Sequence, residues 1–387
     1  MKKLRLVAYL AGFFLTLHLA LPVYIGSSFL SQYMGAGSVG AIYIIASGLG
    51  ILTLATLPQI VRRNGIKFSN LWLIVAEALA FLILIYFNSP LAVIAAFIAI
   101  SALTLALRFN LDLLLEEASS DRTAGETRGI FLTLSNVAWV VSPIIAGHLT
   151  QNNQYNRVYF LSLLMLLPLF YLQKKHLQEP YSTERPRFSI LAELKKLWLA
   201  RRGRRLDIFK ILSLDVLLNF FYAIMVIYTP IYLHQHVGLS WPQIGLVFSV
   251  MLLPFLLLQW PLGRLADRLL GEKEILTAGL IIMSLATLII PWVETQKVWL
   301  WALLLFSTRI GAASMEIMKE SYLFKQISGA DSAILSLSRS TYPLAYVFAP
   351  LLVTLFVIFF PFKHIFTALG LLLLLGLPYS LTLKDTR

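Results

Sequence analysis

Residues 90–107 read PLAVIAAFIAISALTLAL, an uninterrupted run without a charged side chain. A helix rises ~1.5 Å per residue, so about 20 apolar residues span the ~30 Å hydrocarbon core of a bilayer. The run is too long for a strand, and it has almost no polar side chains for water to solvate. We therefore expect a transmembrane helix here, continuing to residue 115.

Runs of similar length recur along the whole chain. Of its 387 residues, 58% are hydrophobic and 13% are charged, which is about half the charged share of a soluble domain. A soluble fold could not bury so much apolar surface, whereas a bilayer solvates it. The predicted fold is all-α, a polytopic membrane protein with twelve transmembrane helices near residues 6–30, 38–60, 68–87, 90–115, 129–150, 156–172, 208–233, 242–262, 275–293, 297–318, 335–359 and 363–383.

Basic residues are distributed unevenly between the connections. The formal net charge of +13 fits either a nucleic-acid surface or a membrane topology signal. The short connections on one side, with the residues beside them, hold only three of the 32 lysines and arginines: Arg157, Lys297 and Lys363. This positive-inside bias predicts a cytoplasmic (inner) membrane protein with both termini in the cytoplasm, and it requires no nucleic-acid partner.

The longest connection, residues 173–207, divides the chain. It ends in a basic cluster, and apolar residues inside it recur at helical spacing: Ile190, Leu191, Leu194, Leu197 and Trp198. This pattern favours an amphipathic helix on the cytoplasmic membrane surface, with an ordinary linker helix as the alternative. We expect an N-terminal six-helix bundle over residues 1–172 and a C-terminal six-helix bundle over residues 208–387.

Three pairs of motifs recur in the same order in both halves. They are separated by about 204 to 207 residues and pair Pro58–Lys67 with Gly263–Lys273, Asp112 and Glu116 with Glu316 and Glu320, and Ala138–Pro143 with Ala345–Pro350. Three matches at nearly one offset predict two pseudo-symmetric halves, an organisation that secondary transporters use.

One of these motifs resembles a known family signature. Residues 263–273 read GRLADRLLGEK, similar to the major facilitator superfamily loop, Gly-x-Leu-Ala-Asp-Arg followed by glycine and basic residues. The resemblance implies a transporter with alternating access, a substrate cavity between the halves, and a cavity lined by helices 1, 4, 7 and 10. It also implies a cytoplasmic gate motif, which falls on Gly263, Asp267, Arg268, Lys273, Arg63 and Gly65. Because Arg62 stands where the family has aspartate, a symmetrical latch is not expected.

Charged side chains inside the predicted spans are candidate functional groups, because each costs at least ~2.5 kcal/mol at bilayer depth. Most fall on spans that correspond to the family's cavity helices, and Arg309 lies near mid-membrane. We predict substrate or cavity contacts for Arg309, Arg108, His18, Asn219, Tyr222, Trp139 and Tyr346. Proton coupling is assigned to Asp112, Asp215, Glu316 and Glu77, because carboxylates can load and release a proton as their surroundings change. The alternatives are structural ion pairs and, for the acids, ordinary charges at the cytoplasmic helix ends.

Several function classes lack their motifs. The sequence has no cysteine, no Gly-x4-Gly-Lys-Ser/Thr loop and no Gly-x-Ser-x-Gly or His-Glu-x-x-His motif. We expect no enzyme activity, no metal site and no cofactor, and instead a monomeric secondary transporter of a small molecule, driven by protons or another ion. Antiport of amphiphilic compounds and transport of an anionic solute both fit. A lipid flippase on the same fold and a lipid-modifying membrane enzyme are the rival interpretations.

Overall fold

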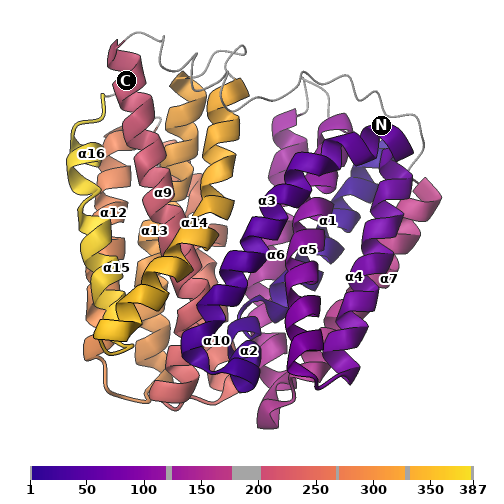
Figure 1. Cartoon of the computed structure of the whole chain (residues 1–387). Coiled ribbons are helices and arrows are strands. Elements are labelled where there is room, and N and C mark those ends of the chain that lie inside the picture. The colour runs from indigo at the N-terminus through magenta and orange to yellow at the C-terminus, as the bar shows by residue number, and fades with distance from the viewer. Residues whose placement is uncertain (1, 119–123, 177–201, 267–269, 327–331, 385–387) are drawn as a thin grey trace. The chain divides into compact units, whose positions relative to one another are not determined.

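The structure is a computed structural model that describes residues 2–118, 124–176, 202–266, 270–326 and 332–384 (Figure 1). Its regular elements are all helices. The chain forms two compact units, residues 1–184 with 233–249 and residues 185–232 with 250–387. Helix α10 therefore contributes to both units.

The first unit is a bundle of long helices, drawn in indigo to magenta in Figure 1 except for its part of α10. Its elements are α1 (Lys2–Val23), α2 (Gly26–Met34), η1 (Ala36–Ser38), α3 (Val39–Asn64), α4 (Ile66–Tyr86), α5 (Pro90–Ala118), α6 (Ala124–Leu149), η2 (Gln151–Asn153), α7 (Tyr155–His176) and the first half of α10 (Trp241–Leu257).

The second unit is also a helical bundle, drawn in rose to yellow. It contains α9 (Arg202–Ile231), the remainder of α10, α11 (Gln259–Leu265), α12 (Glu272–Ile289), η5 (Ile290–Trp292), α13 (Val298–Gln326), α14 (Ser332–Phe359), α15 (His364–Leu374) and α16 (Leu377–Leu381). The short helical element η3 (Tyr232–His236) follows α9.

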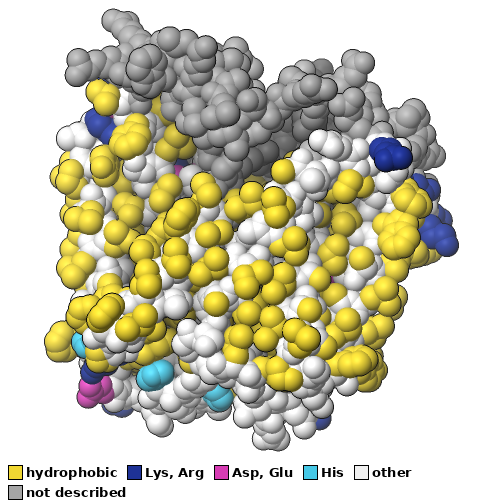
Figure 2. Space-filling view, in the orientation of Figure 1, with side chains coloured by type: hydrophobic (Ala, Val, Ile, Leu, Met, Phe, Trp, Pro, Cys, Tyr) yellow, Lys and Arg dark blue, Asp and Glu magenta, His cyan; other side chains and the backbone are white. Residues whose placement is uncertain are grey.

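Twelve helical segments within the described ranges are long and apolar enough to cross a membrane. They correspond one to one with the twelve runs predicted from the sequence, so the fold prediction is confirmed. Large apolar side chains remain exposed along them, including Leu52, Leu79, Leu91 and Ile358. Figure 2 shows hydrophobic side chains covering the helix sides and charged side chains towards the helix ends. This is the surface of a protein whose solvent is lipid.

The first span is broken between α1 and α2. Pro22 lies in the last turn of α1, and it has no backbone N–H to donate to the carbonyl of His18 four residues earlier. That carbonyl instead accepts a hydrogen bond from the Ser162 hydroxyl of α7, at 2.7 Å. A neighbouring helix thus satisfies the backbone group that proline frees, as membrane helices require.

Apolar packing holds the first unit together. A buried cluster joins α1, α3, α5 and α7 through residues such as Leu15, Leu57, Leu107 and Leu166. Lipid tails are as apolar as these side chains, so close van der Waals packing stabilises the bundle more than the hydrophobic effect does.

Glycine brings α12 and α13 of the second unit into close contact. A Cβ atom at Gly279 would lie 2.8 Å from Cβ of Ser314, which is closer than real side chains approach. Gly311 of α13 faces the backbone of α12 at the same crossing. Small residues let membrane helices approach closely, and this contact positions α13, which carries most of the charged groups described below.

The loop motif adopts a similar backbone turn in the two units. Gly65 connects α3 to α4 with φ 83° and ψ 158°, and Gly271 precedes α12 with φ 96° and ψ 167°. Positive φ favours glycine, which has no Cβ to clash. The two glycines are separated by about the same interval as the predicted repeats, which agrees with duplicated halves.

The division of the chain at residues 173–207 stays a prediction. Helix α7 extends to His176 and α9 starts at Arg202, so helices enter the predicted connection from both sides. The amphipathic helix expected over residues 190–198 lies outside the described residues.

Candidate functional site

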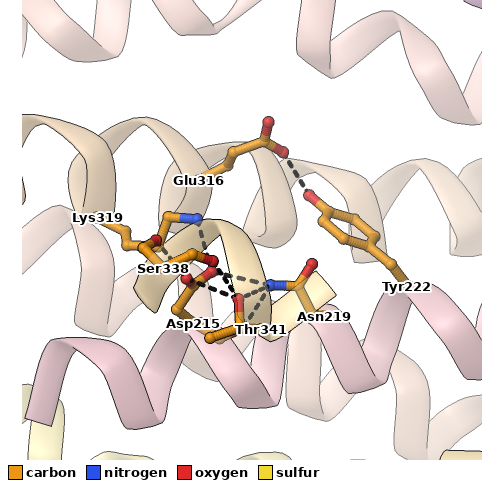
Figure 3. A network of polar contacts seen from close by, with 7 residues as sticks. All are labelled: Asp215, Asn219, Tyr222, Glu316, Lys319, Ser338 and Thr341. Carbon is orange, nitrogen blue, oxygen red and sulfur yellow. Dashed lines mark hydrogen bonds and ion pairs between the residues drawn. The ribbon is translucent and has the colours of Figure 1, made fainter. Parts of the chain in front are cut away.

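The second unit contains a polar network centred on Asp215 (Figure 3). Asp215 belongs to α9, and its side chain is fully buried. Its partners come from three helices: Asn219 from α9, Lys319 from α13, and Ser338 and Thr341 from α14. A side chain that would be costly at bilayer depth alone is thus surrounded by hydrogen-bond donors.

Both oxygens of the Asp215 carboxylate have partners. Oδ1 lies 2.6 Å from Lys319 Nζ and 2.9 Å from Asn219 Nδ2. Oδ2 accepts from Ser338 Oγ at 2.6 Å and lies 2.9 Å from Thr341 Oγ1. A carboxylate accepts through both oxygens, so Asp215 ties α9 to α13 and α14.

Glu316 lies one helical turn before Lys319 on α13 and is less fully paired. One of its oxygens accepts a hydrogen bond from the Tyr222 hydroxyl of α9, at 2.6 Å. In the described part of the chain its other oxygen has no partner, and Figure 3 shows it pointing away from Tyr222. Glu316 is half-buried, whereas Asp215 is fully buried. Glu316 is therefore the less completely paired carboxylate of this site.

Arg309 lies two turns before Glu316 on α13 and is 1% exposed. Its guanidinium carbon is 4.8 Å from the ring centre of Phe221 and 5.7 Å from that of Tyr222, both on α9. Its nitrogen Nη1 is buried without a hydrogen-bond partner. Tyr222 thus contacts Arg309 with its ring and Glu316 with its hydroxyl.

The first unit has a separate buried group around His18 and Glu77. His18 Nε2 lies 3.3 Å from Glu77 Oε1, and both side chains are fully buried. His18 Nδ1 lies 2.8 Å from the Ser162 carbonyl oxygen, and Thr104 Oγ1 donates to Glu77 Oε1. This group joins α1, α4, α5 and α7 inside the bundle.

Four further residues predicted from the sequence lie on α5, α6 and α14. Arg108 is exposed on α5. Asp112 belongs to the same helix, and its side chain lies outside the described part of the structure. Trp139 is half-buried on α6, and the Tyr346 ring lies 4.7 Å from that of Tyr342 on α14.

The gate motif is only partly described. Asp267 and Arg268 lie outside the described residues. Arg63 is exposed at the end of α3. A Cβ atom at Gly263 would meet open space. Lys273 lies in the first turn of α12. Beside it, the buried Glu272 accepts a hydrogen bond from Ser321 of α13, at 2.9 Å.

Sequence reasoning missed the donors of the network. Lys319, Ser338 and Thr341 all bind Asp215, yet none was a candidate. Lys319 lies one residue beyond the predicted end of its span, where a lysine normally marks the membrane boundary. Ser and Thr are common in membrane helices, so only their proximity to Asp215 distinguishes them.

No group of three or more histidine or acidic side chains suited to a metal ion occurs among the described residues. His234 of η3 packs its ring 4.6 Å from that of Trp241. The described residues place buried carboxylate, ammonium, imidazole and guanidinium groups inside a helical membrane bundle. Buried ionisable groups of this kind are typical of secondary transporters.

The comparisons with known proteins agree with this class. The family model of the Major Facilitator Superfamily matches residues 6–243 and 220–387. The chain belongs to the Major Facilitator Superfamily and is therefore a membrane transporter, not an enzyme. No curated protein sequence matches the chain.

Two solved structures have the same fold. A nucleoside transporter, NupG, aligns with a TM-score of 0.74 and 14% identity over 98% of both chains. A peptide transporter, POT, in complex with sulfate aligns with a TM-score of 0.77 and 13% identity over 98% of this chain and 93% of its own. At such low identity the likeness concerns the fold alone.

Proposed function

We propose that this chain is a proton-coupled secondary transporter that moves a small molecule by alternating access. The observation that carries the proposal is that Glu316 lies one turn before Lys319 on α13 and accepts a hydrogen bond from Tyr222, while both oxygens of Asp215 are already paired. In this proposal Glu316 binds the transported proton, while Asp215 is an anchor whose donors are already in place. The sequence assigned coupling to Asp112, Asp215, Glu316 and Glu77, and the full pairing of Asp215 is the reason to prefer Glu316 to it.

Lys319 provides a physical route to coupling. It lies one turn beyond Glu316 on α13 and pairs with Asp215 on α9. A protonated, neutral Glu316 no longer attracts the Lys319 ammonium away from Asp215, whereas an ionised Glu316 does. Protonation therefore changes the strength of the α9–α13 connection, and such a bias is what shifts a two-state equilibrium.

The test is proton movement in proteoliposomes that contain a pH indicator. Compounds that stabilise the purified protein in a thermal-shift screen serve as substrates. We expect proton flux that accompanies substrate flux in the wild type and disappears in Glu316→Gln. The matched control is Glu320→Gln, which removes an exposed carboxylate from the same helix. Equal proton flux in Glu316→Gln and wild type would exclude this role.

The orientation of the chain is part of the proposal. The positive-inside bias supports cytoplasmic termini in the inner membrane, which places the connection at Glu294–Lys297 outside. Because the sequence has no cysteine, a Gln296→Cys variant carries a single thiol. Labelling of intact cells by a membrane-impermeant thiol reagent should succeed at this exposed position, and labelling only after lysis would reverse the topology.

A further inference from the structure

Arg309 has a charge that no described acidic side chain of its unit neutralises. It lies near the middle of the Val298–Leu323 membrane span. Among the described residues, no acidic side chain forms an ion pair with it, and Nη1 is buried without a hydrogen-bond partner. The nearest acid along the helix face, Glu316, is held by Tyr222. A buried charge needs a partner, because desolvation without compensation costs several kcal/mol.

The two aromatic rings limit what that partner can be. Contacts between a cation and an aromatic face stabilise the guanidinium from above or below its plane. They leave the N–H groups at the edge of the plane, and these groups form hydrogen bonds with planar oxygen anions. Aromatic faces such as those of Phe221 and Tyr222 attract cations, so it is the positive charge of Arg309 that selects against a cationic ligand.

We infer that Arg309 binds the carboxylate of the transported molecule, which is a monoanion with an apolar or aromatic body. This inference rests on the proposed transport function and decides between the two substrate classes that composition left open. The carboxylate supplies the missing partner of Nη1. The apolar body suits a site whose neighbouring side chains are the aromatic rings of α9.

Tyr222 connects this substrate site to the proton site. Its ring lies 5.7 Å from the Arg309 guanidinium, and its hydroxyl donates to Glu316. A ligand that moves Arg309 therefore acts on the hydrogen bond of Glu316 through one side chain. Tyr222→Phe keeps the ring and removes that hydrogen bond, so it should retain ligand binding while weakening proton coupling.

The binding experiment uses benzoate, 2-naphthoate and decanoate, each compared with its neutral amide. Affinity for the purified full-length protein is measured by thermal shift and by isothermal titration. We expect at least one acid to bind the wild type more tightly than its amide. We expect Arg309→Gln to weaken that acid by about 10- to 100-fold, as the loss of a charge-assisted hydrogen bond predicts, and to leave the amide unchanged.

Two further variants separate binding from folding. Arg309→Lys keeps the charge without the planar fork and should show an intermediate loss of acid binding. Arg157→Gln, which removes an exposed arginine at the start of α7, is the matched control and should bind as the wild type does. If Arg309→Gln does not fold, as judged by gel filtration, the Arg309→Lys result decides.

The inference is overturned if no acid binds better than its amide, if Arg309→Lys binds acids as the wild type does, or if 2-naphthylmethylamine binds in preference to the acids. Failure of the proposed function is a different result. In that case the acids bind through Arg309, but no proton movement accompanies their flux. Conversely, proton flux that depends on Glu316 with no contribution from Arg309 would refute only the substrate class.

Discussion

The ion pair between Asp215 and Lys319 allows a quantitative test of the network in the second unit. Asp215 is fully buried, the Lys319 side chain is 13% exposed, and Nζ lies 2.6 Å from Oδ1. Lys319→Met removes the ammonium and leaves Asp215 with its hydroxyl and amide partners only. Removing one member of a buried pair costs about 3–5 kcal/mol, because the other charge stays desolvated. We expect the residual donors to keep the loss near ~3 kcal/mol.

The assay is unfolding by SDS in mixed micelles, monitored by tryptophan fluorescence, with the double variant Asp215→Asn/Lys319→Met completing a thermodynamic cycle. Because the double variant leaves no uncompensated charge, it should be more stable than the sum of the single losses predicts. The matched control is Lys363→Met, whose pairing with Glu294 at 3.8 Å is exposed and should contribute almost nothing. Strict additivity of the Asp215 and Lys319 losses would refute the argument that the two charges depend on each other.

Two further predictions concern packing and the first unit, and SDS unfolding measures both. Ser162→Ala leaves the His18 carbonyl without the donor that replaces the N–H missing at Pro22, and should lower the free energy of unfolding by about 1–3 kcal/mol. The control Ser101→Ala loses only a hydrogen bond within its own helix and should cost far less. Equal losses in the two variants would contradict the argument. Gly245→Leu places a side chain against the backbone of α6, at the crossing where a Cβ on Gly147 would lie 2.5 Å from the Trp241 carbonyl oxygen, and overpacking should cost at least ~1–3 kcal/mol. Gly48→Leu meets open space, so a similar loss there would show that the crossing is not special.

The transmembrane helices could be predicted because their signal is local. A run such as residues 90–107 is long and apolar enough to identify a transmembrane helix by itself. That prediction requires no knowledge of which helices pack beside it. The breaks were harder to predict: Pro22 and Pro254 each lie in the last turn of a helix, just before a break in a span that composition alone treats as continuous. Prolines within a membrane helix can be absorbed with or without a break, and the choice depends on neighbouring donors such as Ser162.

The partners of the charged residues could not be predicted from one sequence. Helical spacing places Asp215 and Asn219 on one face, but it does not say which helix meets that face. Lys319 was therefore not a candidate, although it binds Asp215. Glu77 was predicted as a proton-coupling group, and its contact with His18 depends on how α1 and α4 pack. Partner choice is a property of tertiary packing, on which periodicity carries no information.

The most direct test of the central claim is the response of the two units to protonation of Glu316. Spin labels at Gln154→Cys and Gln296→Cys, both in exposed connections of a chain without native cysteine, report the separation of the units by electron spin resonance in lipid nanodiscs. We predict two distance populations whose ratio changes between acidic and alkaline pH, and a Glu316→Gln variant that keeps the acidic ratio at every pH. A single distance that ignores pH, or a Glu316→Gln variant that responds as the wild type does, would contradict it.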